Sequence, residues 1–170
     1  MAVILTANIG FSQSKSTINK SKISFKIKNL GINTGGTIGG LQANIQFNPA
    51  DLAASSVEAS VETKTINTDN DSRDEHLRSD DFFGVARYPK ITLKSVSFKH
   101  NGGKNYTGTF NLTIKDKTKQ IDVPFTYVDE GNNVVIKGNF KIDRLDFGIG
   151  GNSMILGNEV SISVEAEVGK

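Results

Sequence analysis

Residues 69–81 hold the densest set of side chains that could do chemistry. Their carboxylates suggest a calcium-binding loop, and they are Asp69, Asp71, Asp74, Glu75, Asp80 and Asp81. A helix–loop–helix calcium loop requires glycine at its sixth position and glutamate at its twelfth. Counted from Asp69, those positions hold Asp74 and Asp80. We therefore interpret the stretch as a solvated helix whose acids pair with Arg73 and Arg78, and we predict no metal site.

His76 lies close to Asp74 and Ser79, so a Ser-His-Asp arrangement for nucleophilic catalysis has to be considered. Residues this near in sequence rarely form one, and the chain has no Gly-x-Ser-x-Gly turn. The chain has no cysteine and two histidines, which excludes thiol chemistry, disulfides and three-histidine zinc sites. We predict no catalytic residue and no cofactor, a structural polar contact for His76, and a solvent-exposed His100.

Basic and glycine-rich stretches give no sign of a nucleic acid or a phosphate. Twenty Lys and Arg stand against 18 Asp and Glu, a net charge of +2 that does not argue for a nucleic-acid partner. Lys22, Lys26 and Lys28 alternate with apolar residues, as on the outer face of a half-buried strand. Residues 35–40 are glycine-rich but lack the Lys-Ser/Thr of a phosphate loop, and we interpret them as a flexible strand entry.

The elements that position these side chains are strands, because apolar residues recur at every second position. Tight turns rich in Gly, Asn and Asp separate several of the runs. Between Leu93 and Val96 the alternation slips by one residue, which predicts a β-bulge near Ser95. Eight short, closely linked runs fit a closed barrel or a sandwich. They cover residues 23–27, 41–47, 57–61, 91–98, 106–114, 121–127, 134–142 and 160–166.

Three stretches lie outside this rhythm. Residues 49–54 predict one helical turn that begins at Pro49 with Asn48 as its cap, and residues 69–83 predict a helix across one end. Residues 1–13 are first apolar and then small and polar, as at the end of a secretory signal peptide, although no basic residue precedes Lys15. They are too short to span a bilayer, and we predict no transmembrane span.

The domain organisation and location follow from that N-terminal stretch. We expect residues 1–13 to be a signal-peptide remnant and residues 14–170 to form a single domain. The protein is then periplasmic or secreted, with an incomplete signal sequence. If the N-terminus is genuine, the protein is cytoplasmic. The oligomeric state is left open, and a homodimer is compatible with the sequence.

Residues 73–92 carry a motif that decides between the folds. The motif consists of Arg73, Asp74, His76, Leu77, Asp81, Phe82, Phe83, Tyr88 and Pro89, and a later block adds Arg144, Asp146, Phe147 and Gly148. This pattern resembles the signature of the YceI-like polyisoprenoid-binding family. Members often open with an aromatic residue, an acid and a His-Ser pair. Residues 17–22 stand in that place without the histidine or the acid, so the resemblance does not extend to a head-group contact by the first strand.

The resemblance implies an all-β fold, an extended eight-stranded antiparallel β-barrel that is lipocalin-like, with short helical turns at one end. It also implies a secreted or periplasmic lipid-binding protein that holds an isoprenoid, an isoprenoid quinone or another long-chain lipid in its lumen, for transport, storage or sequestration. Two alternatives are an enzyme acting on a lipid or small molecule, and a stress or interaction protein whose own side chains fill the barrel.

The lumen-facing residues follow from burying the apolar side of each strand. We expect Leu77, Phe82 and Phe83 to pack over one barrel end, with a polar ligand head near whichever of Lys22, Arg73 or Arg144 reaches the rim. The predicted lumen residues are Phe25, Ile27, Leu41, Ala43, Ile45, Phe47, Ala59, Val61, Leu93, Phe110, Leu112, Val123, Phe125, Phe140, Ile142 and Ile162.

Overall fold

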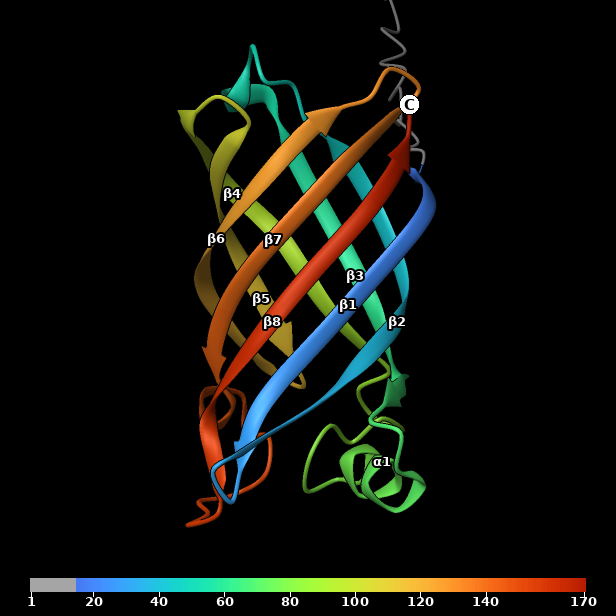
Figure 1. Ribbon diagram of the computed structural model, residues 1–170, viewed down its shortest axis with the longest axis vertical. Helices are drawn as coiled ribbons and strands as arrows, with labels where there is room; N and C mark the ends of the chain where they lie inside the picture. The colour runs from blue at the N-terminus through green and yellow to red at the C-terminus, as the bar shows by residue number, and fades with distance from the viewer. Residues whose placement is uncertain (1–14) are drawn as a thin grey trace, which may run out of the picture.

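Eight antiparallel strands close into one barrel in chain order, with β1 paired to β8 (Figure 1). The structure is a computed structural model that describes residues 15–170, so the predicted signal-peptide remnant at 1–13 lies outside the described residues. This is the eight-stranded antiparallel barrel predicted above. The strands are β1 (Thr17–Asn29), β2 (Ile32–Gln46), β3 (Ser56–Asn67), β4 (Lys90–Gly102), β5 (Asn105–Ile114), β6 (Lys117–Asp129), β7 (Asn133–Asp143) and β8 (Leu156–Gly169).

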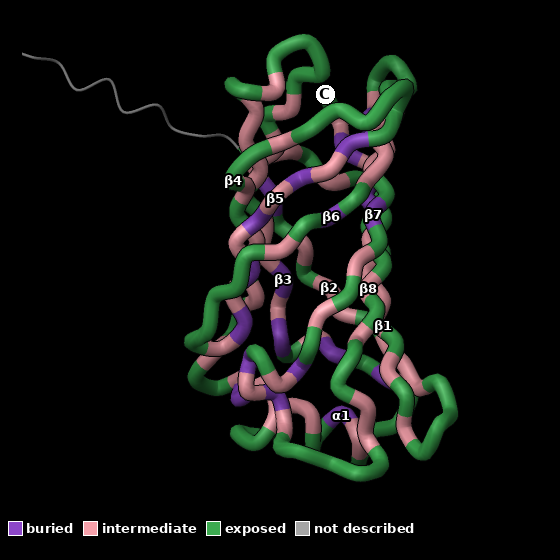
Figure 2. The backbone as a smooth tube through the Cα atoms, turned by 90° about the vertical axis from the view of Figure 1, so that its left-hand side faces the viewer, coloured by how far each residue is buried: buried purple, intermediate pink, exposed green. Residues whose placement is uncertain are grey.

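Strand register brings apolar residues of neighbouring strands onto the same inner face. Ile162 of β8 lies opposite Phe25 on one side and opposite Phe140 on the other. Residues directly opposite each other project to the same face of a sheet, so these three side chains meet inside the barrel. Figure 2 shows the alternation of burial along the strands.

The predicted β-bulge is present in β4. The pairing with β5 shifts between Ser95 and Ser97, which leaves Val96 as the extra residue. Val96 is exposed, whereas Phe98 returns to the inner face opposite Gly108. The bulge therefore keeps the apolar residues on both of its sides inside the barrel.

Three helical segments connect strands. The α-helix α1 (Asp71–Arg78) lies within the predicted helical stretch, and the Asn70 side chain caps it by accepting a hydrogen bond from the Arg73 N–H. The short helix η2 (Arg144–Phe147) follows β7. The helix η1 (Leu52–Ala54) starts later than expected and takes Asp51 as its cap, because Asn48 instead bonds the Ala50 N–H in a local turn.

The glycine-rich stretch 35–40 is part of strand β2 rather than a flexible entry to it. A Cβ atom at Gly36 would collide with the Asn67 carbonyl and lie 2.9 Å from the Phe25 ring. Glycine is therefore required there by close approach of the neighbouring strands.

The two ends of the barrel carry different connections. The β1–β2, β3–β4, β5–β6 and β7–β8 connections lie at the lower end of Figure 1, together with α1 and η2. The upper end holds η1 and the C-terminus. Strand β3 pairs with β4 only from Glu58 to Glu62. The later residues of β3 are therefore not paired with β4, and α1 packs against β3 at the lower end.

Candidate functional site

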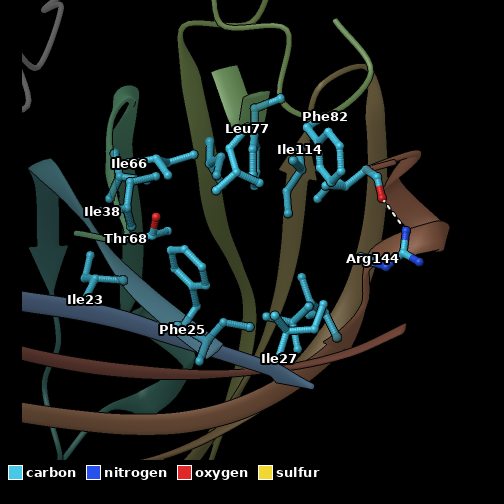
Figure 3. A pocket seen from close by; sticks show the side chains of 18 of the residues that line it. Ile23, Phe25, Ile27, Ile38, Ile66, Thr68, Leu77, Phe82, Ile114 and Arg144 are labelled. Atoms are coloured by element: carbon cyan, nitrogen blue, oxygen red, sulfur yellow. Dashed lines mark hydrogen bonds between the residues drawn. The ribbon is translucent and has the colours of Figure 1, made fainter. Parts of the chain in front are cut away.

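A cavity of about 370 Å³ occupies the lower half of the barrel. In Figure 3, Ile23, Phe25 and Ile27 project into it from β1, and Leu77 and Phe82 approach it from the α1 side. Ten of the predicted lumen residues line it: Phe25, Ile27, Leu41, Ala59, Val61, Leu93, Leu112, Phe140, Ile142 and Ile162.

The other six predicted lumen residues do not line this cavity, and they are Ala43, Ile45, Phe47, Phe110, Val123 and Phe125. They belong to the upper half, which aromatic rings fill. The Phe47 ring lies 4.8–5.6 Å from the rings of Phe98, Tyr106, Phe125 and Tyr127, measured between centroids. We call the cluster of Phe47, Phe98, Tyr106, Phe110, Phe125 and Tyr127 the aromatic plug. Strand parity determines which way a side chain faces but not whether space remains beside it.

Several cavity residues were not among those predicted. Ile23, Ile91, Val160 and Val164 lie within the alternating runs and share the inward parity of their strands, so the same alternation was signal enough to include them. Ile38 and Ile66 also line the cavity, but they lie where the β2–β3 pairing shifts register. Sequence alternation does not place residues at such irregular positions.

A polar network attaches α1 to the end of β3 at the lower end of the cavity, which we call its mouth. The buried Asp74 carboxylate accepts hydrogen bonds from the Thr68 N–H (2.9 Å) and hydroxyl (2.5 Å). Arg73 donates from Nε to the Thr68 hydroxyl and from Nη2 to the Thr68 carbonyl, both at 2.8 Å. Within the described residues, Arg73 Nη1 has no hydrogen-bond partner, so part of this guanidinium remains available at the cavity.

Arg78 makes a second attachment between α1 and β3. It donates to the carbonyls of Lys64 and Ile66. Thus Arg73 and Arg78 do not pair with the acids of their own helix as predicted, because carbonyl groups at the end of β3 take up their donors. Five of the six acids are exposed, and the described residues contain no group of three metal-binding side chains.

Leu77, Phe82 and Phe83 lie over the cavity end of the barrel, as predicted. The His76 ring lines the mouth and stands edge-on to Phe82, with ring centroids 4.9 Å apart. Among the described residues its side chain makes this aromatic contact rather than the predicted polar one. His100 is exposed at the other end, where its ring stacks on Tyr106.

Tyr88 and Pro89 of the motif act through their main chains. The Thr63 hydroxyl donates to the Tyr88 carbonyl at 2.7 Å, and the Thr63 N–H donates to the Pro89 carbonyl at 3.0 Å. Thr63 is buried, so this pair of bonds anchors the segment after α1 to strand β3.

Arg144 is buried and holds the loop after η2 against β8. Its five N–H groups all have acceptors: the carbonyls of Gly157, Ile149, Gly151 and Leu156 and the Asn158 side-chain oxygen. Figure 3 shows Arg144 at the edge of the cavity. A saturated guanidinium has no donor left for a ligand, so Arg144 has a structural role.

The rest of the late motif block supports the same loop. Phe147 is buried in the core cluster with Leu112, Ile114 and Ile149. Gly148 ends η2 in the left-handed conformation (φ 65°), which glycine adopts without strain. Asp146 is exposed.

Asn29, at the end of β1, places an unusual polar atom on the cavity lining. Its Oδ1 is buried without a hydrogen-bond partner in the described part of the chain. Most buried polar atoms in proteins are paired, so this one is a candidate contact for a ligand group. Lys22, by contrast, is exposed opposite Glu165 and does not line the cavity.

The upper end carries an ion pair beside the aromatic plug. Lys170 Nζ lies 2.5 Å from Asp129 Oδ1, and this hydrogen bond, supported by the Gly131 N–H, lowers the pKa of the Asp129 carboxyl. Burial, with the nearby Asp129 charge, raises the pKa of the Tyr127 hydroxyl. These two shifts favour an anionic Asp129 and a neutral Tyr127.

Residues 15–168 match the model of the YceI-like domain. The chain belongs to the YceI-like family. Among curated relatives, a UPF0312 protein of Azotobacter vinelandii is 28% identical over 85% of this chain and 79% of its own length. A UPF0312 protein of Pseudomonas savastanoi is 31% identical over 76% of this chain and 71% of its own. Neither match indicates a catalytic family.

Solved YceI-like structures share the barrel. Burkholderia cenocepacia BcnA superposes with a TM-score of 0.84 at 26% identity, covering 89% of this chain and 98% of BcnA. A polyisoprenoid binding domain from Saccharophagus degradans superposes with a TM-score of 0.73 over 91% of this chain and 97% of its own. At 13% identity, that likeness shows the fold alone. Within the described residues, no helix is long and apolar enough to cross a membrane.

Proposed function

We propose that this YceI-like protein reversibly binds one long apolar lipid chain in the lower half of its barrel, without chemical conversion. The observation that carries the proposal is the cavity of about 370 Å³, whose lining is mostly aliphatic and aromatic. Burial of apolar chain there gains roughly 0.8 kcal/mol per CH₂ group. Pockets of small-molecule ligands commonly have this apolar character, and the volume of this cavity lies within their usual range.

The aromatic plug limits how far a chain enters. A tail that enters at the α1 end meets the aromatic plug where the hollow lower half ends and the filled upper half begins. The cavity therefore selects ligands by length and width more than by chemistry, because apolar burial is non-directional.

The head of the ligand would stay at the mouth, where charge and polar groups remain hydrated. Within residues 15–170, Arg73 Nη1 has no acceptor and the Asn29 oxygen has no donor, so the mouth offers one donor group and one acceptor. A hydroxyl or similar small polar head suits these groups. Arg144 takes no part because its donors are saturated.

The chemistry of the lining favours binding over catalysis. Titratable side chains on the cavity lining are those of Arg73, His76 and Arg144, and they include no nucleophile paired with a base. The Saccharophagus domain of the same fold is named as a polyisoprenoid binding domain, which supports an isoprenoid or related chain as the ligand. Transport, storage or sequestration outside the cytoplasm is the corresponding physiological role that we propose.

Two alanines that face each other across β2 and β3 provide the test. Ala59 lines the cavity, whereas its partner Ala43 is buried outside it. Ala59→Phe should raise the Kd for geranylgeraniol, measured by displacement of a fluorescent polyene fatty acid, by about tenfold or more because the new ring occupies the cavity.

Ala43→Phe is the matched control. It should leave the Kd within about threefold of the wild type while costing about 1–3 kcal/mol of folding free energy through overpacking. Unfolding curves of both variants separate lost binding from lost folding, and Val61→Phe serves as a second cavity variant. If folded Ala59→Phe and Val61→Phe bind the alcohol as tightly as wild type, the cavity is not the site.

A further inference from the structure

Four large apolar side chains lie in solvent at the tips of two neighbouring loops. Leu30, in the β1–β2 turn, is 70% exposed and Ile32, the first residue of β2, is 71% exposed. Met154 and Ile155, before β8, are 104% and 55% exposed. The Leu30 N–H donates to the Ile155 carbonyl at 2.8 Å, so the loops adjoin. Figure 1 shows both at the lower end of the barrel. We call these four residues the apolar rim.

The apolar rim borders the mouth of the cavity. Asn29 and Leu156 line the cavity, and they are the sequence neighbours of Leu30 and Ile155. The two exposed tips are joined to each other, so they lie together beside the end of the barrel at which a chain would leave the cavity. Single exposed apolar residues are ordinary, but a group of them beside an apolar cavity is typical of an interaction surface.

Charge and shape indicate what covers the apolar rim. Lys26 and Lys28 are exposed on β1 just before the β1–β2 turn, and their cross-strand neighbours are Gly35, Asn33 and Ser161, so no carboxylate faces them in the described pairing. Apolar tips flanked by lysines suit a bilayer surface, where lysines meet lipid phosphates and apolar residues reach the acyl boundary. The acidic α1 segment lies on the other side of the same end.

We propose that the apolar rim inserts into the surface of a phospholipid bilayer and places the cavity mouth against it. The proposal rests on lipid binding in the cavity as its purpose: a chain then moves between bilayer and cavity without crossing water. Protruding tips enter the interfacial region of a bilayer, whereas a protein partner of this chemistry would require a complementary groove.

Vesicle binding by the full chain tests the proposal. The rim variant combines Leu30→Asn, Ile32→Thr, Met154→Ser and Ile155→Thr. Asparagine suits the left-handed backbone of residue 30 (φ 51°), and threonine keeps the β-branch at positions 32 and 155. In sedimentation with vesicles of phosphatidylcholine and phosphatidylglycerol, the rim variant should show a partition coefficient at least about tenfold below wild type.

The matched control is Val96→Thr, which removes a 52% exposed apolar side chain from the β4 bulge instead of the rim. It should partition as wild type does. Residues 1–14 are the same in every variant, so the comparison isolates the rim. Lys26→Gln with Lys28→Gln should weaken binding to the mixed vesicles more than to pure phosphatidylcholine.

Three results would overturn the proposal: no binding of wild type to vesicles, equal binding by the rim variant, or a wild-type dimer that the rim substitutions dissociate in sedimentation without vesicles. The cavity is tested separately. The rim variant should retain the wild-type Kd for geranylgeraniol added without vesicles, and Ala59→Phe should lose that affinity but still bind vesicles. Failure of lipid binding and failure of docking are thus distinguishable.

Discussion

The upper and lower halves of this barrel use the same strands in opposite ways. In the upper half, the aromatic plug fills the interior ring against ring. In the lower half, the same strands present mostly isoleucine, leucine, valine and alanine, with Phe25 and Phe140, around a cavity. The boundary runs between the paired residues Ala43 and Ala59.

This difference indicates that packing in the upper half stabilises the barrel, whereas the lower half provides the space for a ligand. A half filled by packed rings gains contacts on all sides of each ring. A hollow half lacks those contacts. Hydrogen bonds of Arg144 on one side and of Asp74 on the other hold its lower end together. The lower half is therefore expected to lose most from breaking a polar anchor, and the upper half from removing a ring.

The largest loss in the free energy of unfolding is expected from a substitution of Arg144. Arg144→Met keeps the length of the side chain but leaves several carbonyls without donors, so it should lower the free energy of unfolding by about 3–5 kcal/mol. Chemical denaturation measures the loss. Arg87→Met is the control, because Arg87 is 63% exposed in an ion pair with Asp80 and should cost less than about 1 kcal/mol. Similar small losses in both variants would show that the lower end is held by something other than this anchor.

An intermediate effect should distinguish the rings of the two halves. Phe47→Ala removes a ring that contacts four others and should cost about 3 kcal/mol. Phe25→Ala should cost about 1–2 kcal/mol, because one side of that ring already borders the cavity. Urea unfolding of both variants gives the difference, and equal losses would contradict the division between a filled and a hollow half.

The smallest effect concerns the ion pair beside the aromatic plug. Lys170→Ala should raise the pKa of Asp129 towards its ordinary value, although the Gly131 N–H still holds it partly down. A lowered native pKa contributes stability at pH values above the ordinary carboxyl pKa of about 4, and that stability is lost as pH falls through the native pKa. The variant should therefore show slightly weaker pH dependence of stability in acid, and carboxyl NMR titration of Asp129 measures the shift directly. An unchanged pKa would mean that Lys170 does not act on Asp129 in solution.

The sequence by itself determined the strands and their inner faces. Alternation identified the eight runs, and the slip after Leu93 identified the bulge, because both depend on a period of two that neighbours along the chain define. The motif at residues 73–92 was sufficient to indicate the family, and it placed Leu77, Phe82 and Phe83 at one end of the barrel.

Only the tertiary structure decided where the barrel is hollow and where it opens. Phe47 and Phe25 have the same inward parity, but four rings from β4, β5 and β6 converge on Phe47, and Phe25 faces a gap. The acceptors of Arg144 lie in a loop whose path no periodicity encodes. The apolar rim joins residues more than a hundred positions apart, because closure of the barrel brings the end of β1 and the turn after it beside the start of β8. The volume of the cavity, the path of the loop that Arg144 binds and the contact between the two rim loops are properties of the closed barrel. They cannot be derived from the sequence of any single strand.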